Sequence, residues 1–163
     1  MTHPHTLVDE TPISPLKQRA IEIEVAEAFR FAMTERLGQP VADELFQEAV
    51  DRLADSAAQG LRDRYPNPKL AELWEVWSHL GGDGRLDLKL DELTDERLRF
   101  HVDHCAYADM YESRGQAEAG VAFSCRRDAP FAKALVPGVT VEQSRTILEG
   151  NSRCEFTYTL EDR

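Results

Sequence analysis

Three stretches in the first half of the chain carry apolar residues at helical spacing. They cover residues 14–38, 39–61 and 67–80, and each has a proline near its start. The apolar positions are Ile21, Val25, Ala28, Phe29, Ala32 and Met33 in the first stretch, Val41, Leu45, Ala49, Leu53, Ala57 and Leu61 in the second, and Leu70, Leu73, Trp74, Trp77 and Leu80 in the third. The pattern predicts three consecutive helices, the last of which stops at a group of glycines.

After these glycines the apolar period changes to the alternation of a strand. Residues 86–91 and 97–102 alternate apolar with charged residues around a turn at 94–96, which predicts an antiparallel hairpin. The remaining expected elements are a helix over 106–123 broken at Gly115, a short helix over 129–135, and strands over 139–148 and 153–160. The prediction is an α+β fold, with N-terminal helices packed on a mostly antiparallel sheet of about four strands and short helices inserted between the hairpins. We expect one domain over residues 13–163 after a flexible tail at residues 1–12.

The composition of the chain argues against some classes of binding partner. The chain has 163 residues, 42% of them apolar, and a net charge of -11 because 30 acidic residues outnumber 19 basic ones. The apolar content is enough for a hydrophobic core, and the acidic surface repels phosphate backbones and anionic lipid. The N-terminus lacks a basic start followed by an apolar segment, and no apolar run is long enough to cross a bilayer. We therefore expect a cytoplasmic protein that binds neither nucleic acid nor membrane.

All three cysteines, Cys105, Cys125 and Cys154, lie in the last third of the chain. An odd number with no close spacing argues against a disulfide scaffold and suits a reducing compartment. Cys105 has the best case for reactivity, because it is predicted at a strand-to-helix junction near His101 and His104, and a helix N-terminus favours a thiolate. Free cysteines are also common in hydrophobic cores, so packing is the alternative for each of them.

Zinc ligation is a second chemistry open to these side chains. Cysteine thiolates and a histidine suit zinc if they converge in space. Structural zinc sites usually bring their ligands in close pairs, whereas these cysteines stand far apart in the sequence. We therefore expect no metal and no other cofactor.

Asp128 and the nearby arginines form another group of candidates. The carboxylate could act as a general base or orient a substrate amidine, or it could be the N-cap of the helix that starts at residue 129. Arg126, Arg127 and Arg145 make a locally basic region in an acidic protein, and a guanidinium suits a small carboxylate through paired hydrogen bonds. The same arginines could equally be solvated surface charges.

The order of these residues resembles a known enzyme family. The matching segments are His104-Cys105-Ala106-Tyr107, Cys125-Arg126-Arg127-Asp128 followed by Phe131, the run from Thr146 to Gly150, and Arg153-Cys154-Glu155-Phe156 with Tyr158. This ordered set resembles the signature of the L-2-amino-thiazoline-4-carboxylic acid hydrolase family. The resemblance covers the last third of the chain well, and the preceding helices agree in type and order.

The resemblance implies hydrolytic opening of a small cyclic amidine or amide ring, in the named case a thiazoline that bears a carboxylate and yields an N-carbamoyl amino acid. Such a reaction needs a nucleophile or activated water, a proton donor for the leaving group, and a cation that holds the carboxylate. By residue type we expect Cys105 as the nucleophile, His104 or Asp128 as the base, and Arg127 or Arg145 as the carboxylate clamp. The other matching positions expected to bind this small-molecule substrate are Tyr107, Cys125, Thr146 and Cys154.

Two other classes of function stay open. The ending with Gly150, Cys154 and Phe156 also resembles vinyl-reductase-type ligand-binding domains, which implies a non-enzymatic small-molecule sensor. Alternatively, the apolar N-terminal helices provide the contact surface of a homo-oligomer. An enzyme is expected to bring Cys105 or Asp128 into a concave pocket together with an arginine.

Overall fold

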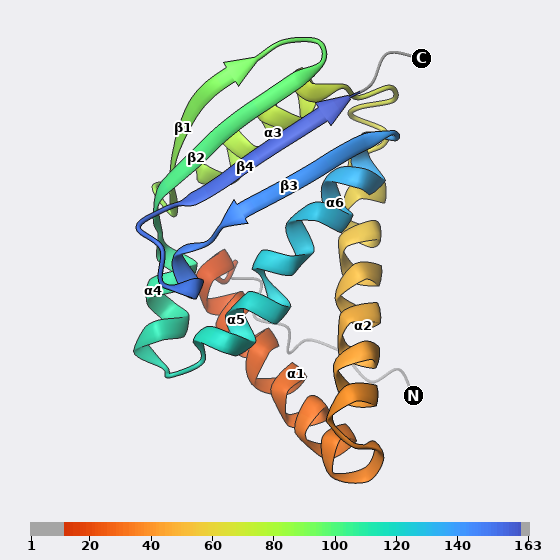
Figure 1. Cartoon of the computed structure of the whole chain (residues 1–163), viewed down its shortest axis with the longest axis vertical. Coiled ribbons are helices and arrows are strands. Elements are labelled where there is room, and N and C mark those ends of the chain that lie inside the picture. The colour runs from red at the N-terminus through yellow and green to blue at the C-terminus, as the bar shows by residue number, and fades with distance from the viewer. Residues whose placement is uncertain (1–11, 161–163) are drawn as a thin grey trace, which may run out of the picture.

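A computed structural model of the chain describes residues 12–160. The tail expected at residues 1–12 therefore lies outside the described residues, apart from residue 12. The elements follow in the order α1 (Pro15–Leu37), α2 (Gln39–Gln59), α3 (Leu70–Gly81), β1 (Leu86–Leu93), β2 (Arg97–Cys105), α4 (Ala106–Ser113), α5 (Ala117–Phe123), the 3-10 helix η1 (Cys125–Arg127), α6 (Asp128–Leu135), β3 (Val139–Arg145), the 3-10 helix η2 (Ile147–Glu149) and β4 (Cys154–Leu160) (Figure 1). This order confirms the predicted α+β fold, with helices first and short helices between the hairpins.

The first two helices begin where their prolines predict. Ser14 caps α1, because its Oγ accepts a hydrogen bond from the amide of Lys17 at 3.2 Å, and Pro15 follows at the first helical position. Gly38 separates α1 from α2 and has a φ of 84°, in the left-handed region that favours glycine. The two helices then pack against each other, and α2 runs on to pack against α6.

The apolar stripes that predict α1 and α2 are not the faces that pack in the structure. Ile21, Val25 and Phe29 of α1 are 50%, 55% and 67% exposed, whereas Ile23 is buried. In α2 the buried residues are Ala42, Phe46, Val50, Ala54 and Ala58. Both helices carry apolar residues on more than one side, so spacing alone does not select the packed face. The homo-oligomer expected from these helices stays a prediction.

The sheet has the strand order β1-β2-β4-β3, and each neighbouring pair is antiparallel. β1 and β2 form the predicted hairpin. β3 ends at Arg145, earlier than expected, because the next residues leave the ladder. The Thr146 carbonyl accepts hydrogen bonds from the amides of Glu149 and Asn151, and Gly150 turns the chain with a φ of 85°.

The helices after the hairpin lie in the predicted places. The segment over residues 106–123 breaks at Gly115, which has a φ of 67°, into α4 and α5. η1 leads directly into α6, so α6 begins at Asp128 and no side-chain hydrogen bond from Asp128 caps it. The N-cap interpretation of Asp128 is therefore wrong, and its carboxylate is available for another role.

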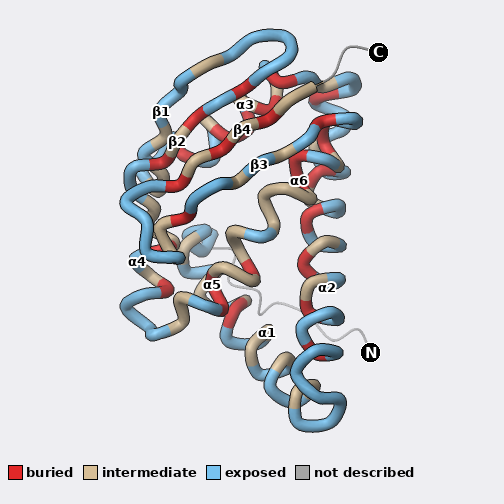
Figure 2. Tube along the Cα trace, in the orientation of Figure 1, coloured by how far each residue is buried: buried red, intermediate tan, exposed pale blue. Residues whose placement is uncertain are grey.

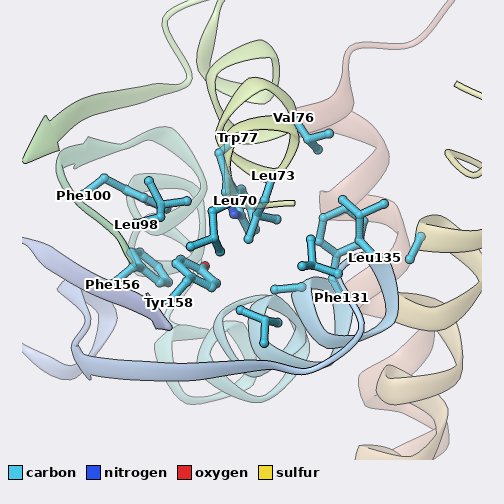
Figure 3. Close-up of a cluster of buried hydrophobic side chains, with 14 of the residues drawn as sticks. Leu70, Leu73, Val76, Trp77, Leu98, Phe100, Phe131, Leu135, Phe156 and Tyr158 are labelled. Atoms are coloured by element: carbon cyan, nitrogen blue, oxygen red, sulfur yellow. The ribbon is translucent and has the colours of Figure 1, made fainter. Parts of the chain in front are cut away.

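One face of the sheet packs on α3 and α6 to form the main core (Figure 3). The ring of Trp77 lies 6.1 Å from Phe100, 5.7 Å from Phe131 and 6.4 Å from Phe156, measured between centroids. Figure 2 shows buried positions alternating with less buried ones along β2 and β4, as expected for a sheet with one covered face. The predicted inward position of Cys154, beside Phe156 and Tyr158 on β4, is confirmed.

A second cluster of buried side chains joins α1, α2, α4 and α5. Its members are Ile23, Phe46, Val50, Tyr111, Ala119 and Phe123. This cluster fixes α1 against the segment that leads into η1. Within residues 12–160, none of the helices combines the length and the apolar character needed to cross a bilayer.

Candidate functional site

A cavity of about 400 Å³ opens between the covered face of the sheet, α3 and the segment from α4 to α6. All four strands and most of the helices contribute to its walls. Among its apolar lining residues are Leu61, Val76, Trp77, Leu88, Phe100, Val102, Phe131 and Phe156. Among its polar ones are Arg19, Tyr107, Tyr111, Ser124, Arg127, Asp128 and Gln143. A cavity of this volume with a few polar groups is typical of a small-molecule site.

Most of the candidate residues from the sequence line this one cavity. They are Cys105, Tyr107, Cys125, Arg127, Asp128 and Cys154. The pairing of β2 with β4 places Val102 opposite Cys154, so Cys105 at the end of β2 comes near the start of β4. η1 and the first residue of α6 carry Cys125, Arg127 and Asp128 to the same place. The fold thus collects side chains that are far apart in the sequence.

Asp128 is the acidic side chain among them. The residue keeps some exposed surface, but its carboxyl group lies deep among protein atoms. Burial raises the pKa of Asp128 from an ordinary value of 3.8 to about 7, against the opposing effect of the positive charges of Arg19 and Arg127. A carboxyl group with this pKa exchanges its proton near neutral pH, which is the property of a general acid or base.

The three thiols at the cavity are held in their protonated form. Burial raises the pKa of Cys105, and the negative charge of Asp128 acts in the same direction. The amides of Ala108 and Tyr107 at the start of α4 oppose this rise but do not cancel it. The thiolate that we expected from the helix N-terminus is therefore disfavoured by burial, and a base is needed to form it.

Cys125 and Cys154 have raised pKa values for the same reason. Burial raises the pKa of Cys125 far above its ordinary range, and raises that of Cys154 to about 11. The Sγ of Cys154 accepts a hydrogen bond from the amide of Ile147 at 3.3 Å. Charge on Asp128 would raise the pKa of both thiols, so this carboxyl group is electrostatically coupled to all three cysteines.

Three arginines line the cavity: Arg64, which pairs with Glu75 at 2.9 Å, and Arg19 and Arg127, whose positive charges act on Asp128. Burial lowers the pKa of Arg127, and the positive charge of Arg19 lowers it further. Arg19 lies 3.6 Å from a carboxylate oxygen of Glu22 and stacks on the ring of Phe123 at 5.2 Å. Its Nη1 is buried and, among the described residues, has no hydrogen-bond partner. Two adjacent cations with an unpaired buried donor form a place for an anion.

Arg19 is the functional candidate that the sequence analysis missed. It comes from α1, far from the C-terminal motifs, and its neighbours in the sequence do not distinguish it from a surface arginine. The signal that could have found it is its place on the same helical face as Ile23, the buried residue of α1. That face is not the one marked by the apolar stripe.

Three of the expected site residues lie outside the cavity. The Nε2 of His104 lies 2.7 Å from Asp109, and the ring is exposed to solvent. Arg145 is exposed, with its Nε 3.8 Å from Glu155. Thr146 is buried, but its hydroxyl donates a hydrogen bond to Glu149 at 2.6 Å and belongs to the turn after β3. We therefore do not assign His104, Arg145 or Thr146 to the candidate site.

Tyr107 contributes to the cavity wall from the first turn of α4. Its hydroxyl accepts a hydrogen bond from Nη1 of Arg85 at 2.6 Å, and Nε of Arg85 lies 2.6 Å from Asp83. This chain of contacts fixes the tyrosine ring. Within residues 12–160, no group of three or more histidine, cysteine, aspartate or glutamate side chains is arranged to hold a metal ion.

Comparison with solved structures gives a match to the phenol-responsive sensory domain of the transcription activator PoxR, in a crystal structure with phenol. The TM-score is 0.51, the sequence identity is 14%, and the match covers 85% of this chain and 73% of that chain. A likeness at this identity shows a shared fold. Comparison with curated protein sequences gives no match.

Comparison with protein-family models gives a match over residues 18–158. The matched region includes α2 to β3 and most of α1 and β4, and with them every residue of the cavity described above. It confirms the resemblance carried by the cysteine motifs and extends it to the N-terminal helices. The chain belongs to the L-2-amino-thiazoline-4-carboxylic acid hydrolase family.

Proposed function

We propose that this chain is a hydrolase that opens a small cyclic amidine or amide ring, of the kind represented by 2-amino-thiazoline-4-carboxylate. The observation that carries the proposal is the convergence of Asp128, Cys105 and two guanidinium groups on a single cavity of about 400 Å³. Membership of the family supports a hydrolytic reaction.

Asp128 acts as the base. Of the two bases considered from the sequence, Asp128 lines the cavity and His104 does not. With a pKa of about 7, Asp128 is partly ionised at neutral pH and gains or loses a proton at little cost in free energy. Cys105 acts as the nucleophile, and its raised pKa is the reason that it depends on Asp128.

The reaction then proceeds in two halves. Asp128 takes the proton of Cys105, and Sγ attacks the ring carbon between nitrogen and sulfur. The bond from this carbon to the ring sulfur breaks, and the sulfur leaves as a thiol with the proton that Asp128 held. In the second half Asp128 takes a proton from water and the hydroxide adds to the same carbon. The bond to Cys105 breaks, Sγ takes back the proton that Asp128 held, and the proton of the added hydroxyl moves to nitrogen to give the carbamoyl group. The sum is the addition of one water to the ring.

Arg19 and Arg127 hold the carboxylate of the substrate. Both line the cavity, and the buried Nη1 of Arg19 supplies a free donor. Of the two clamps considered from the sequence, Arg127 lies at the cavity and Arg145 pairs with Glu155 elsewhere. Tyr107, Cys125 and Cys154 form the walls that confine the ring. A fixed carboxylate places the ring carbon at one position relative to the nucleophile.

The test is turnover of 2-amino-thiazoline-4-carboxylate, followed by mass spectrometry. Wild-type protein should add one water to the compound, and the Cys105→Ser variant should lose at least about 100-fold in rate. The matched control is His104→Gln, which removes a titratable side chain outside the cavity and should retain the wild-type rate. Absence of turnover on this compound and on a panel of other cyclic amidines and amides would refute the proposal.

A second candidate function is a small-molecule sensor without catalysis. The apolar lining of the cavity and the fold shared with a sensory domain favour it. A sensor should show a rise in Tm with a ligand that is recovered unchanged. Consumption of the ligand, lost in Cys105→Ser, separates the enzyme from the sensor.

A further inference from the structure

The side chains that line the cavity fall into two chemical groups. Arg19, Arg127, Asp128 and Cys105 are the groups that the proposed reaction uses. The apolar lining, which includes Leu61, Trp77, Phe100, Phe131 and Phe156, has no role in that reaction. The aromatic rings of this apolar lining pack on one another in the main core, so they form a rigid wall.

The smallest substrate of the proposed kind does not fill the cavity. The thiazoline carboxylate has nine non-hydrogen atoms, and even at the volume that one water occupies in the liquid, roughly 30 Å³ each, they need less than about 270 Å³. The cavity measures about 400 Å³. A bare ring therefore leaves part of the cavity, and part of its apolar lining, without an occupant.

An unfilled apolar wall is costly to leave in contact with water. Trp77, Phe100 and Phe156 are almost fully buried, so their remaining contact with solvent lies along the cavity. Each methylene that displaces water from such a wall contributes enough free energy to raise binding about fourfold. The wall therefore favours ligands with an apolar extension over the bare ring.

From this arrangement we infer that the preferred substrates carry an aromatic or branched aliphatic substituent on the ring, which occupies the part of the cavity lined by Trp77, Phe100 and Phe156. The inference rests on the proposed function, since it assigns the carboxylate to the arginines. It changes the substrate class from a small amino-acid-derived ring to an apolar substituted one. The substituent contributes through the transition state as well, because it adds to the positioning of the ring.

The experiment compares 2-amino-thiazoline-4-carboxylate with its 5-methyl, 5-isobutyl and 5-phenyl derivatives. For each compound, kcat/KM and the rise in Tm are measured with wild-type protein. We expect both to increase along the series, with kcat/KM for the phenyl compound at least about tenfold above that of the parent.

Two variants on the same helix make the test specific. Ala57 of α2 and Leu61 both line the cavity, and Ala57→Phe should reduce the ratio of kcat/KM between the phenyl compound and the parent. Ala49 is exposed on α2 and does not line the cavity, so Ala49→Phe should leave that ratio unchanged. If Ala57→Phe does not fold, Leu61→Ala is measured in its place. This variant enlarges the cavity, so it should raise the kcat/KM of a larger 5-naphthyl derivative relative to that of the parent compound.

The outcomes separate this inference from the proposed function. Turnover of the parent with no gain along the series overturns the inference and leaves the hydrolase in place. If no compound is turned over, but the rise in Tm grows along the series and is smaller in Ala57→Phe, the result supports binding of the substituent by the apolar lining and refutes hydrolysis. Neither turnover nor a rise in Tm with any compound overturns both.

Discussion

Arg19 and Arg127 meet at the cavity although one comes from α1 and the other from η1, and burial together with the positive charge of Arg19 lowers the pKa of Arg127. Glu22 pairs with Arg19, and Asp128 is only partly ionised at neutral pH, so these two carboxyl groups do not fully neutralise both cations. The cavity therefore has an excess of positive charge around these arginines in a protein whose net charge is -11. An anionic ligand would relieve this excess.

The first prediction concerns this pair. Arg19→Gln should raise KM for 2-amino-thiazoline-4-carboxylate about 10- to 100-fold, because it removes a charge-assisted hydrogen bond to the substrate carboxylate. The matched control is Arg145→Gln, which removes a guanidinium that lies outside the cavity. Steady-state kinetics check the prediction. Equal changes in KM for the two variants would contradict it.

A neutral analogue provides an independent check on the same clamp. The carboxamide of the substrate should bind wild-type protein weakly, and its affinity should change little in Arg19→Gln. A loss of affinity for the amide as large as the loss for the acid would show that Arg19 acts on the fold rather than on the carboxylate.

The second prediction concerns pH. Because Asp128 must be ionised to act as a base and its pKa is about 7, kcat/KM should rise tenfold per pH unit below 7 and level off above it. The profile is measured with wild-type protein from pH 5 to 9. A profile that is flat between pH 5 and 8 would remove Asp128 from the reaction.

The third prediction follows from the same pKa as an effect on stability. The pKa of Asp128 is raised in the folded state from 3.8 to about 7. The contribution of protonated Asp128 to the free energy of unfolding is therefore fully present below pH 3.8. It declines as the pH rises from 3.8 to about 7, and it changes no further at higher pH. Asp128→Asn removes that decline, so its Tm should exceed that of wild type by more at pH 8 than at pH 5. Differential scanning calorimetry at both pH values checks this, and an equal difference at both would contradict it.

The fourth prediction concerns the cysteines. Cys105→Ser should remove turnover, whereas Cys154→Ser should retain part of it, since a serine hydroxyl can still accept the hydrogen bond from the amide of Ile147.

Raised pKa values should also make Cys105 and Cys154 react slowly with iodoacetamide at pH 7. Peptide mass spectrometry after timed alkylation measures this, and rapid labelling of either thiol at pH 7 would contradict the account.

The fifth prediction tests the packing behind the cavity. A Cβ at Gly120 would lie 2.6 Å from the ring of Tyr111 and 2.9 Å from Leu148, so Gly120→Ala should destabilise the protein by about 1 to 3 kcal/mol. The matched control is Gly60→Ala, where the nearest atom lies 3.5 Å away and the backbone is right-handed helical. Urea unfolding compares the two, and equal stabilities would show that α5 does not pack on Tyr111 as described.

The sequence predicts the elements of this fold well because their signals are local. The prolines that begin α1 and α2, the alternation in β1 and β2 and the break at Gly115 each act within a few residues. The pattern predicts too long a β3, because the hydrogen bonds that the Thr146 carbonyl accepts from the following turn compete with the strand ladder.

The site is less accessible to the sequence because it depends on contacts between distant segments. The cysteine motifs identified Cys105, Cys125 and Cys154, but their meeting around Asp128 requires the pairing of β2 with β4. Arg19 was missed because the packing of α1 on α4 and α5, and not its apolar stripe, decides which face turns inward. His104 is next to Cys105 in the sequence, yet it is exposed to solvent. Leu88 pairs with Val102 but Leu86 pairs with Cys105, and this register shift interrupts the alternation that would place His104 on the same face as Val102.

The measurement that tests the central claim most directly is kcat/KM of Asp128→Asn on 2-amino-thiazoline-4-carboxylate, beside His104→Gln and wild type. We expect a loss of at least about 100-fold for Asp128→Asn with a folded protein, and a rate within about twofold of wild type for His104→Gln. Retention of the wild-type rate by Asp128→Asn, or an equal loss in both variants, would contradict it.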